Sequence, residues 1–324
     1  MLPSLTTIIS RLRLKQLRLL IALDEFGSLH KAADAVAITQ PGATKALHEI
    51  ESTLGSTLFE RTPKGLAPND LGRCVIRYAR LIHTDVAHLR EEMLGIMQGH
   101  GGRLSVGVIM GAVPVLVECL ARLRAKQPQL SVEIVEDTSA RLLALLDEGR
   151  LDIAICRTSV SKNPAAYDCR LRDQEPLIVV ANTRHRFAGR DLLTLSELAD
   201  SPWVVFPVNM PMRLTLEREF REAGLNFPTY PIETSSTFTT LSLLLQDPHL
   251  VAVMPVDVAQ MAVTHGMLVH LPLELKSRSE PYEIVTRQGV ALTAPTQLLI
   301  DEMSVQAQKH PPDHSPQRLL PDHE

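Results

Sequence analysis

The chain has 324 residues, of which 45% are hydrophobic, with 33 Lys and Arg against 37 Asp and Glu and a formal net charge of −4. This composition excludes a wholly disordered chain and predicts two or three domains, since a domain usually holds roughly 100–200 residues. The longest uncharged run near the middle, 104–117, is shorter than the roughly 20 residues of a membrane-spanning helix. The N-terminus has neither a basic start nor a small-residue cleavage site, so no signal peptide is expected.

The four cysteines are widely spaced and form no CxxC pair. This spacing favours reduced thiols over a disulfide framework, and it predicts no metal site and no bound cofactor. Together with the absence of a predicted membrane segment, it indicates a cytoplasmic protein that makes no membrane contact.

The charge is unevenly distributed. Residues 1–80, which we call the head, carry 11 Lys and Arg against 7 Asp and Glu, a net of +4, whereas residues 101–324 carry 21 against 27, a net of −6. A solvated surface can produce the same modest positive charge. The pattern of side chains therefore has to decide whether the head binds nucleic acid.

Three short helices are predicted in the head. Apolar residues recur at helical spacing over 14–26, and Gly27 ends that segment. Ser28 is a good N-cap for a second helix over 28–36, and Thr39 caps a third that ends at Gly55. Two short helices joined by a tight turn form a helix-turn-helix pattern.

The third helix opens with side chains that suit base-edge readout. Gln40 can pair with adenine, Lys45 can reach guanine or phosphate, and Pro41 and Thr44 can touch a thymine methyl. A strand from Leu58 then leads into a loop, a wing with two cationic side chains, Arg61 and Lys64. On spacing alone, the alternative that these polar residues only cover a small helical domain stays open.

The segment from Ser28 to Gly72 resembles the winged helix-turn-helix of LysR-type transcriptional regulators. The shared positions are Ser28, Ala32, Ala33, Gln40, Pro41, Thr44, Ile50, Glu51, Leu54, Gly55, Leu58, Phe59, Arg61 and Gly72. The resemblance implies DNA contacts by Gln40, Pro41, Thr44, Lys45 and Arg61. The chain departs from the family pattern at Thr44, Ile50 and Asn69, where Ser, Leu and Thr are usual.

A long helix is predicted over 70–98, because apolar residues recur there at close to 3.6 residues for about eight turns. At 1.5 Å per residue it would be roughly 42 Å long. Its apolar stripe needs cover from the chain's own body or from a second copy. The resemblance implies a homodimer, with further pairing into a homotetramer, and glycines at 99, 101 and 102 as a hinge. A dimer favours a two-fold symmetric promoter site with half-sites roughly 34 Å apart.

Beyond the hinge, strands and helices alternate. A β-α-β-α-β order over 103–156 implies a parallel sheet with helices on its faces, and a second series starts near residue 175. This order resembles the effector domain of the same family, which is similar to periplasmic solute-binding proteins. The expected fold class is an all-α-rich winged helix-turn-helix head, a long linker helix and a two-lobed α/β effector-binding domain. The expected domains are 12–72 (DNA-binding), 70–98 (linker), 103–308 (effector-binding; lobe I 103–174 and 282–308, lobe II 175–281) and 309–324 (a disordered tail).

The effector is expected between the lobes, because ligands in open α/β sheets bind at the carboxyl ends of strands. Backbone N–H groups at a helix start and clustered hydroxyls suit an organic acid or a sugar-like metabolite, and an arginine could clamp a carboxylate. The candidate residues are Gly111, Ala112, Thr138, Ser139, Pro207, Asn209, Arg213, Ser235 and Ser236. For the hydroxyls, plain helix capping is the alternative, and Arg213 could simply be solvated.

An enzyme is not expected. The sequence has no GxSxG, P-loop, HExxH or GxGxxG motif and no Cys/His set at metal-ligand spacing. A second alternative is a solute-binding module whose head no longer binds DNA. The sequence therefore favours a DNA-binding regulator controlled by a small metabolite.

Overall fold

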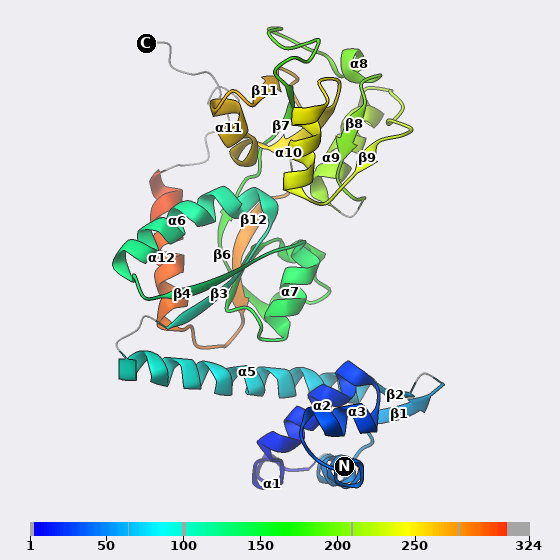
Figure 1. The fold of residues 1–324 in the computed structure, drawn as a ribbon, viewed down its shortest axis with the longest axis vertical. Coiled ribbons are helices and arrows are strands. Elements are labelled where there is room, and N and C mark those ends of the chain that lie inside the picture. The colour runs from blue at the N-terminus through cyan, green and yellow to red at the C-terminus, as the bar shows by residue number, and fades with distance from the viewer. Residues whose placement is uncertain (1–2, 64, 99–101, 209, 278, 310–324) are drawn as a thin grey trace. The chain divides into compact units, whose positions relative to one another are not determined.

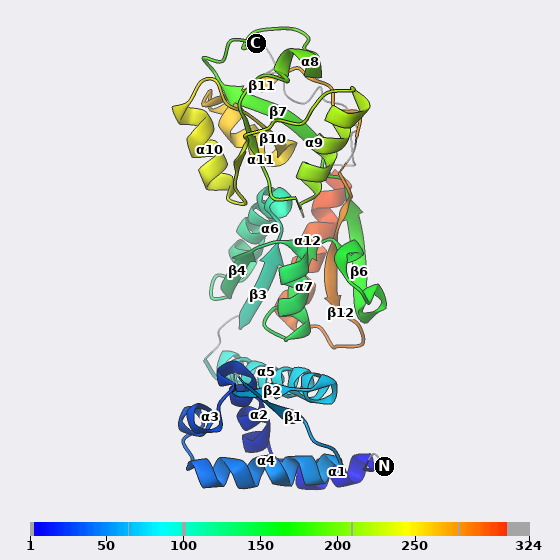
Figure 2. The same cartoon turned by 90° about the vertical axis from the view of Figure 1, so that its right-hand side faces the viewer.

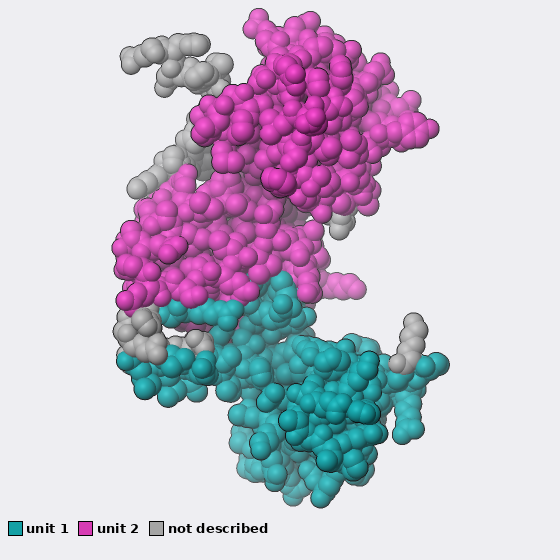
Figure 3. Space-filling view, viewed as in Figure 1, with its two compact units in different colours: residues 1–103, 144–151 teal, residues 104–143, 152–324 magenta. Residues whose placement is uncertain are grey.

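The computed structural model describes residues 3–63, 65–98, 102–208, 210–277 and 279–309. By its internal contacts the chain divides into two compact units, shown in Figure 3: unit 1 comprises residues 1–103 and 144–151, and unit 2 comprises residues 104–143 and 152–324. Residues 99–101 of the predicted hinge at 99–102 and residues 310–324 of the predicted tail at 309–324 lie outside the described residues. Lys309, predicted to belong to the disordered tail, is the last residue of a helix. Among the described residues, no helix is both long and apolar enough to cross a membrane.

The head contains four helices before the wing, and three of them share one apolar core (Figure 1). The four helices are α1 (Leu5–Arg11), α2 (Leu14–Phe26), α3 (Leu29–Ala35) and α4 (Gln40–Leu54). The core joins side chains of α2, α3 and α4, including the fully buried Leu20, Leu23, Ala32, Ala43 and Ile50. The predicted helices at 14–26, 28–36 and 39–54 are confirmed to within a residue at each end.

Helix α1 was not predicted from the sequence. None of its residues is buried, so it has no apolar stripe from which periodicity could identify it. Its start is set locally, because the Ser4 hydroxyl accepts a hydrogen bond from the Thr7 backbone N–H at 3.2 Å.

The wing is a two-stranded hairpin of β1 (Phe59–Thr62) and β2 (Gly65–Pro68). Gly65 has φ +121°, and a Cβ there would lie 2.4 Å from the carbonyl oxygen of Gly27. That carbonyl accepts a hydrogen bond from the Leu66 backbone N–H at 2.8 Å. The close approach allowed by glycine therefore fixes the wing on the C-terminal end of α2.

Helix α5 (Asp70–Gln98) has the bounds that its periodicity predicted. Its first half packs on the head through the buried Ile76 and Ala79. Arg80 adds ion pairs to two carboxylates at the end of α2, Asp24 at 2.9 Å and Glu25 at 3.2 Å. The other apolar face of α5 is exposed at Tyr78, Ile82, Val86, Leu89, Met93 and Met97.

Unit 2 contains two five-stranded sheets, seen on different levels in Figure 2. The first has strand order β4-β3-β5-β12-β6, and we call it and its helices lobe I. Its strands are β3 (Arg103–Val108), β4 (Ser131–Glu136), β5 (Ile153–Cys156), β6 (Tyr167–Asp173) and β12 (Tyr282–Arg287). Its helices are α6 (Val113–Lys126), α7 (Ser139–Asp147) and α12 (Ala294–Lys309), with 3-10 turns at Met110–Ala112, Thr158–Val160 and Pro164–Ala166.

The second sheet has strand order β11-β7-β10-β8-β9, and we call it and its helices lobe II. Its strands are β7 (Leu177–Asn182), β8 (Trp203–Val205), β9 (Ile232–Glu233), β10 (Val251–Pro255) and β11 (Leu268–Leu271). Its helices are α8 (Leu195–Leu198), α9 (Pro211–Glu222), α10 (Thr237–Gln246) and α11 (Val256–Thr264). Sequence reasoning missed β6, α8, α11 and β11.

The parallel pairing predicted over 103–156 is confirmed for β3 and β5, but each complete sheet is mixed. Strand β3 pairs β5 in parallel, and β8 pairs β9 and β10 in parallel, but β12 is antiparallel to β5 and β6, and β7 is antiparallel to β10 and β11. The antiparallel strands lie where the chain passes between the lobes, from β6 to β7 and from β11 to β12. A strand that arrives from another sheet needs no right-handed βαβ crossover, so its direction is not constrained to be parallel.

In lobe I, α6 and α12 are joined by a buried carboxylate. Glu302 accepts a hydrogen bond from Arg122 Nε at 3.1 Å and another from the Lys126 ammonium. The hydrogen bond from Lys126 lowers the pKa of Glu302, with a further contribution from Arg122. A carboxyl whose pKa is lowered on folding contributes stability that is present above its unfolded value, about 4.3, and is lost as the pH falls through the folded value.

Glu302→Gln is therefore expected to lower the Tm of the full chain at pH 7 and to flatten its dependence on pH. The wild type should lose Tm more steeply than the variant as the pH falls below about 4.3. Thermal unfolding at a series of pH values measures both slopes, with Glu136→Gln, an exposed carboxylate on β4, as the matched control. Parallel curves for wild type and Glu302→Gln would contradict the assignment.

Candidate nucleic-acid interface and effector site

Helix α4 presents a polar face from its first turn. The Thr39 hydroxyl caps its start by accepting from the Gly42 backbone N–H at 3.3 Å, and Gly55 ends it at φ 72°. The inward positions Ala43, Leu47 and Ile50 are buried in the head core, which forces the intervening positions outward. In Figure 2, α4 lies on the side of the head opposite α5.

The structure brings four of the predicted DNA-contact residues onto this exposed face: Gln40, Pro41, Thr44 and Lys45. The Thr44 hydroxyl donates to the Gln40 carbonyl at 3.1 Å, within the helix. The Lys45 ammonium lies 4.0 Å from Glu49 and its side chain is 81% exposed. Such an exposed pair is weak, so the ammonium can exchange its partner for a phosphate at small cost.

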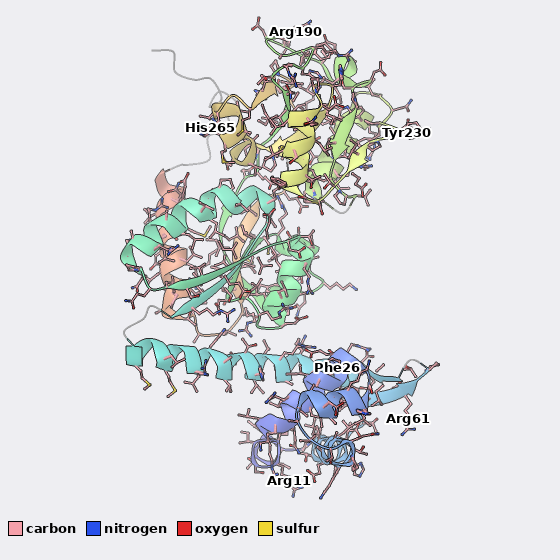
Figure 4. All side chains as sticks on the ribbon, in the orientation of Figure 1. Arg11, Phe26, Arg61, Arg190, Tyr230 and His265 are labelled. Atoms are coloured by element: carbon pink, nitrogen blue, oxygen red, sulfur yellow. The ribbon has the colours of Figure 1, made fainter. Side chains whose placement is uncertain are left out.

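The wing carries one further predicted contact that the structure describes. Arg61 is exposed on β1, opposite Leu66 of β2, and Figure 4 shows it at the side of the head where the wing projects. Lys64, the other predicted wing contact, lies outside the described residues.

In lobe I, a buried ion pair lies where β3, β4 and β5 end. Arg157, directly after β5, is 4% exposed, and its Nη2 lies 2.5 Å from Oε2 of Glu175, which is 2% exposed. The Arg157 Nε also donates to the Glu280 carbonyl at 2.8 Å, and the Ser279 hydroxyl donates to the Glu175 carboxylate at 3.0 Å. Glu175 precedes β7, and Ser279 and Glu280 precede β12, so Arg157 contacts both segments that connect the lobes.

Burial raises the pKa of Glu175, and the charge of Arg157 opposes that shift. The ion pair thus compensates only part of the cost of removing this carboxylate from water. Ionised Glu175 depends on Arg157 for its main favourable contact.

Two predicted effector residues touch this buried pair. The Ser139 hydroxyl accepts from the Arg157 backbone N–H at 3.2 Å. Gly111 is buried, and a Cβ there would lie 1.7 Å from Oε1 of Glu175. A carboxylate of the chain itself therefore reaches the helix start at which sequence reasoning placed an anionic ligand.

Sequence reasoning missed Arg157, Glu175 and Ser279. Glu175 and Ser279 lie 18 and 122 residues from Arg157 along the chain, so no local spacing links them to it. One feature of the sequence could have identified Arg157 as a site residue, because it is a charged residue immediately after the buried strand β5. A charge in that position needs a partner in the fold.

The remaining predicted effector residues are spread over four segments, two in each lobe. In lobe I, Ala112 is buried and the Thr138 backbone N–H donates to Asp137 at 2.7 Å. In lobe II, Ser236 caps α10 by accepting from the Thr239 backbone N–H at 3.2 Å, as the capping alternative foresaw. Ser235 is exposed and Pro207 half-buried, and Asn209 lies outside the described residues.

Arg213 is engaged within lobe II, with a side chain only 11% exposed. Its Nε donates to Glu217 at 2.6 Å, Nη1 lies 3.8 Å from Glu233, and the guanidinium stacks 4.2 Å from the Phe227 ring centroid. Its buried Nη1 has no hydrogen-bond partner within the described residues, and its role as a clamp stays a prediction. Within the described residues no cluster of three or more His, Cys, Asp or Glu could hold a metal ion.

A helix-turn-helix head with a wing, followed by a long helix and two α/β lobes, defines a DNA-binding regulator with a small-molecule-binding domain. The profile of the bacterial regulatory helix-turn-helix protein, lysR family, matches residues 14–73, and that of the LysR substrate binding domain matches residues 97–307. The chain belongs to the LysR family of bacterial transcriptional regulators.

The chain is also similar in sequence or in fold to known transcriptional regulators. The transcriptional regulator GbpR of Azospirillum brasilense is 32% identical over 278 residues, which cover 85% of this chain and 81% of GbpR. A full-length OxyR variant of Pseudomonas aeruginosa has a similar fold, with a TM-score of 0.62 at 19% identity, over 97% of this chain and 99% of that one. Full-length CbnR in complex with its target DNA gives a TM-score of 0.64 at 18% identity, over 91% of this chain and all of that one.

Proposed function

We propose that the polar face of α4 reads base edges in the major groove, through Gln40, Pro41, Thr44 and Lys45, while Arg61 and Lys64 of the wing contact the backbone. The observation that carries this proposal is the exposure of all four α4 side chains on one face of a helix whose other face is locked in the head core. Gln and Lys at the start of such a helix match adenine and guanine edges.

Two copies of the chain form the binding unit. The apolar stripe on α5, from Tyr78 to Met97, is exposed within unit 1, with Tyr78 at 54%, Leu89 at 57% and Met97 at 78%. Its spacing suits packing of one helix against the same helix of a second copy. A homodimer places two α4 helices on one duplex and favours a two-fold symmetric promoter site. Further pairing yields a homotetramer.

The effector is an organic acid or a sugar-like metabolite that binds between the lobes, at the carboxyl ends of their strands. Its contacts come from Gly111, Ala112, Thr138 and Ser139 of lobe I and from Pro207, Asn209, Arg213, Ser235 and Ser236 of lobe II. Support comes from backbone N–H groups and hydroxyls at helix starts in both lobes. The Glu175 carboxylate beside Gly111 favours hydroxyl groups over a second carboxylate at the lobe I end.

The chain acts as a regulator rather than as an enzyme, and its place of action is the bacterial cytoplasm, where the chromosome lies. Binding of the effector changes the balance between arrangements of the lobes, and this balance controls promoter recognition or activation.

Sequencing of chromosomal fragments retained by the purified chain, with and without panels of organic acids and sugars, tests the proposal. A small set of fragments with a two-fold symmetric sequence should be enriched, and one class of ligand should raise the Tm and alter the retained set. Uniform retention of all fragments would contradict sequence-specific binding. Acid binding that Arg213→Ala leaves undiminished would contradict the anion clamp.

A further inference from the structure

The positive charge of the head is concentrated before the second helix ends. Residues 1–23 carry four Lys and Arg and no acidic residue, whereas residues 24–80 carry seven of each sign. The whole net charge of +4 therefore lies in α1, the α1–α2 junction and the part of α2 that precedes Asp24. Two of these cations, Arg11 and Arg13, precede the residues matched by the helix-turn-helix profile, which begin at 14.

The α1–α2 junction is fixed beside the third turn of α4. The Arg13 backbone N–H donates to Gln16 Oε1 at 3.0 Å, and Gln16 Nε2 donates to Glu49 of α4 at 3.4 Å. Gln16 is buried, so this connection is held in place. Helix α1 itself packs against α4.

The Gln16–Glu49 contact places the α1–α2 junction close to the proposed DNA-reading face of α4. Glu49 lies 4.0 Å from the Lys45 ammonium, four residues further along α4. Four residues rise about 6 Å along a helix, half the width of the major groove, about 12 Å. Side chains at the junction are therefore within reach of the sugar–phosphate edge of a groove that α4 occupies.

Arg11 and Arg13 are exposed, and no ion pair joins either of them to an acidic side chain within the described part of the chain. In Figure 4, Arg11 and Arg61 lie on opposite sides of α4. The wing thus flanks the helix on one side and α1 on the other. Glu49, the acidic side chain that Gln16 contacts, also lies 4.0 Å from the Lys45 ammonium.

We infer that α1 and the α1–α2 junction form an additional DNA-backbone contact, with Arg11 and Arg13 binding phosphates on the side of α4 opposite the wing. This inference rests on the proposed use of α4 in DNA binding and extends that interface beyond the helix-turn-helix. Guanidinium groups suit phosphate oxygens through paired N–H donors. Contacts of this kind add affinity and register without sequence information.

The test compares the full-length wild type with Arg11→Gln/Arg13→Gln on a mixed-sequence DNA duplex, by fluorescence anisotropy over a series of salt concentrations. Each lost phosphate contact lowers the slope of log K against log salt by about 0.9, so the double variant should lose about 2 per bound protomer. At about 0.1 M salt its affinity should be lower by about tenfold to a hundredfold. The matched control is Arg77→Gln, an exposed cation on α5.

An unchanged slope in the double variant, with a binding wild type, would overturn the inference and leave the proposed function standing. Failure of the wild type itself to bind DNA would instead contradict the proposed function. The competing explanation is that α1 is a protein interface, because its apolar side chains Leu5 and Ile9 are 71% and 72% exposed. If Leu5→Ser/Ile9→Ser lowers the oligomeric mass while the arginine variant binds normally, α1 is a protein interface and the inference is wrong.

Discussion

Gln40→Ala/Lys45→Ala is expected to abolish sequence-specific DNA retention while leaving the chain folded. Each well-placed base contact is worth about 1–3 kcal/mol of discrimination, so the pair should cost about 2–6 kcal/mol per protomer. Both side chains are exposed on α4, and neither belongs to the head core, so unfolding should not contribute. Gel shift with the most enriched chromosomal fragment, against a scrambled duplex of the same length, measures the loss of specificity.

The control for this double variant is Arg77→Gln, which removes one cation from α5 and should keep specificity. The two single substitutions on α4 should also have different effects on DNA binding. Gln40→Ala should relax the choice of base with little change in salt dependence, whereas Lys45→Ala should lower the salt slope if the ammonium binds phosphate. Full retention of specific binding in Gln40→Ala/Lys45→Ala would show that another surface reads the DNA.

Arg157→Met is expected to destabilise the chain by about 3–5 kcal/mol at pH 7. It removes the guanidinium that lies 2.5 Å from Glu175 and leaves that carboxylate 2% exposed without its countercharge. Burial already raises the pKa of Glu175, and loss of Arg157, which opposes the shift, must raise it further. Urea unfolding of the full-length chain measures the loss.

The pH dependence of this loss identifies its cause. A carboxyl whose pKa is raised on folding contributes stability that is present below its unfolded value, about 4.3, and is lost as the pH rises through the folded value. The deficit of Arg157→Met should therefore be smaller at pH 5 than at pH 7. Adding Glu175→Gln should recover part of the stability at pH 7. An equal deficit at both pH values, with no recovery in the double variant, would show that the packing of Arg157 and not the charge of Glu175 dominates.

The helices of the head could be predicted closely because their signals are local. Gly27 and Gly55 end helices in the left-handed region, and Thr39 caps α4 through its own hydroxyl. Each is a bond within a few residues, so the sequence contains both partners. Helix α5 was equally predictable, because apolar residues at helical spacing over 29 residues are compatible with a helix and not with a strand.

The candidate DNA interface was also predictable in outline, since the buried positions of α4 decide which side chains face outward. The inferred extension of this interface to α1 could not be predicted from the sequence. Helix α1 has no buried residue, and the Gln16–Glu49 contact that fixes it spans 33 residues.

The resemblance of residues 28–72 to LysR-type regulators indicated the class of protein. By itself, the sequence also determined the start and end of helices α2 to α5 and the division of a −4 chain into a basic head and an acidic body. Those follow from caps, periodicity and composition, which act over one or two turns. Only the tertiary structure decided that the sheets are mixed, that Arg157 is paired with Glu175 beside Gly111, and that the net charge of the head borders α4. Each of these depends on segments far apart in the chain meeting in space, where burial changes the free energy of a charge and no local spacing records the partner.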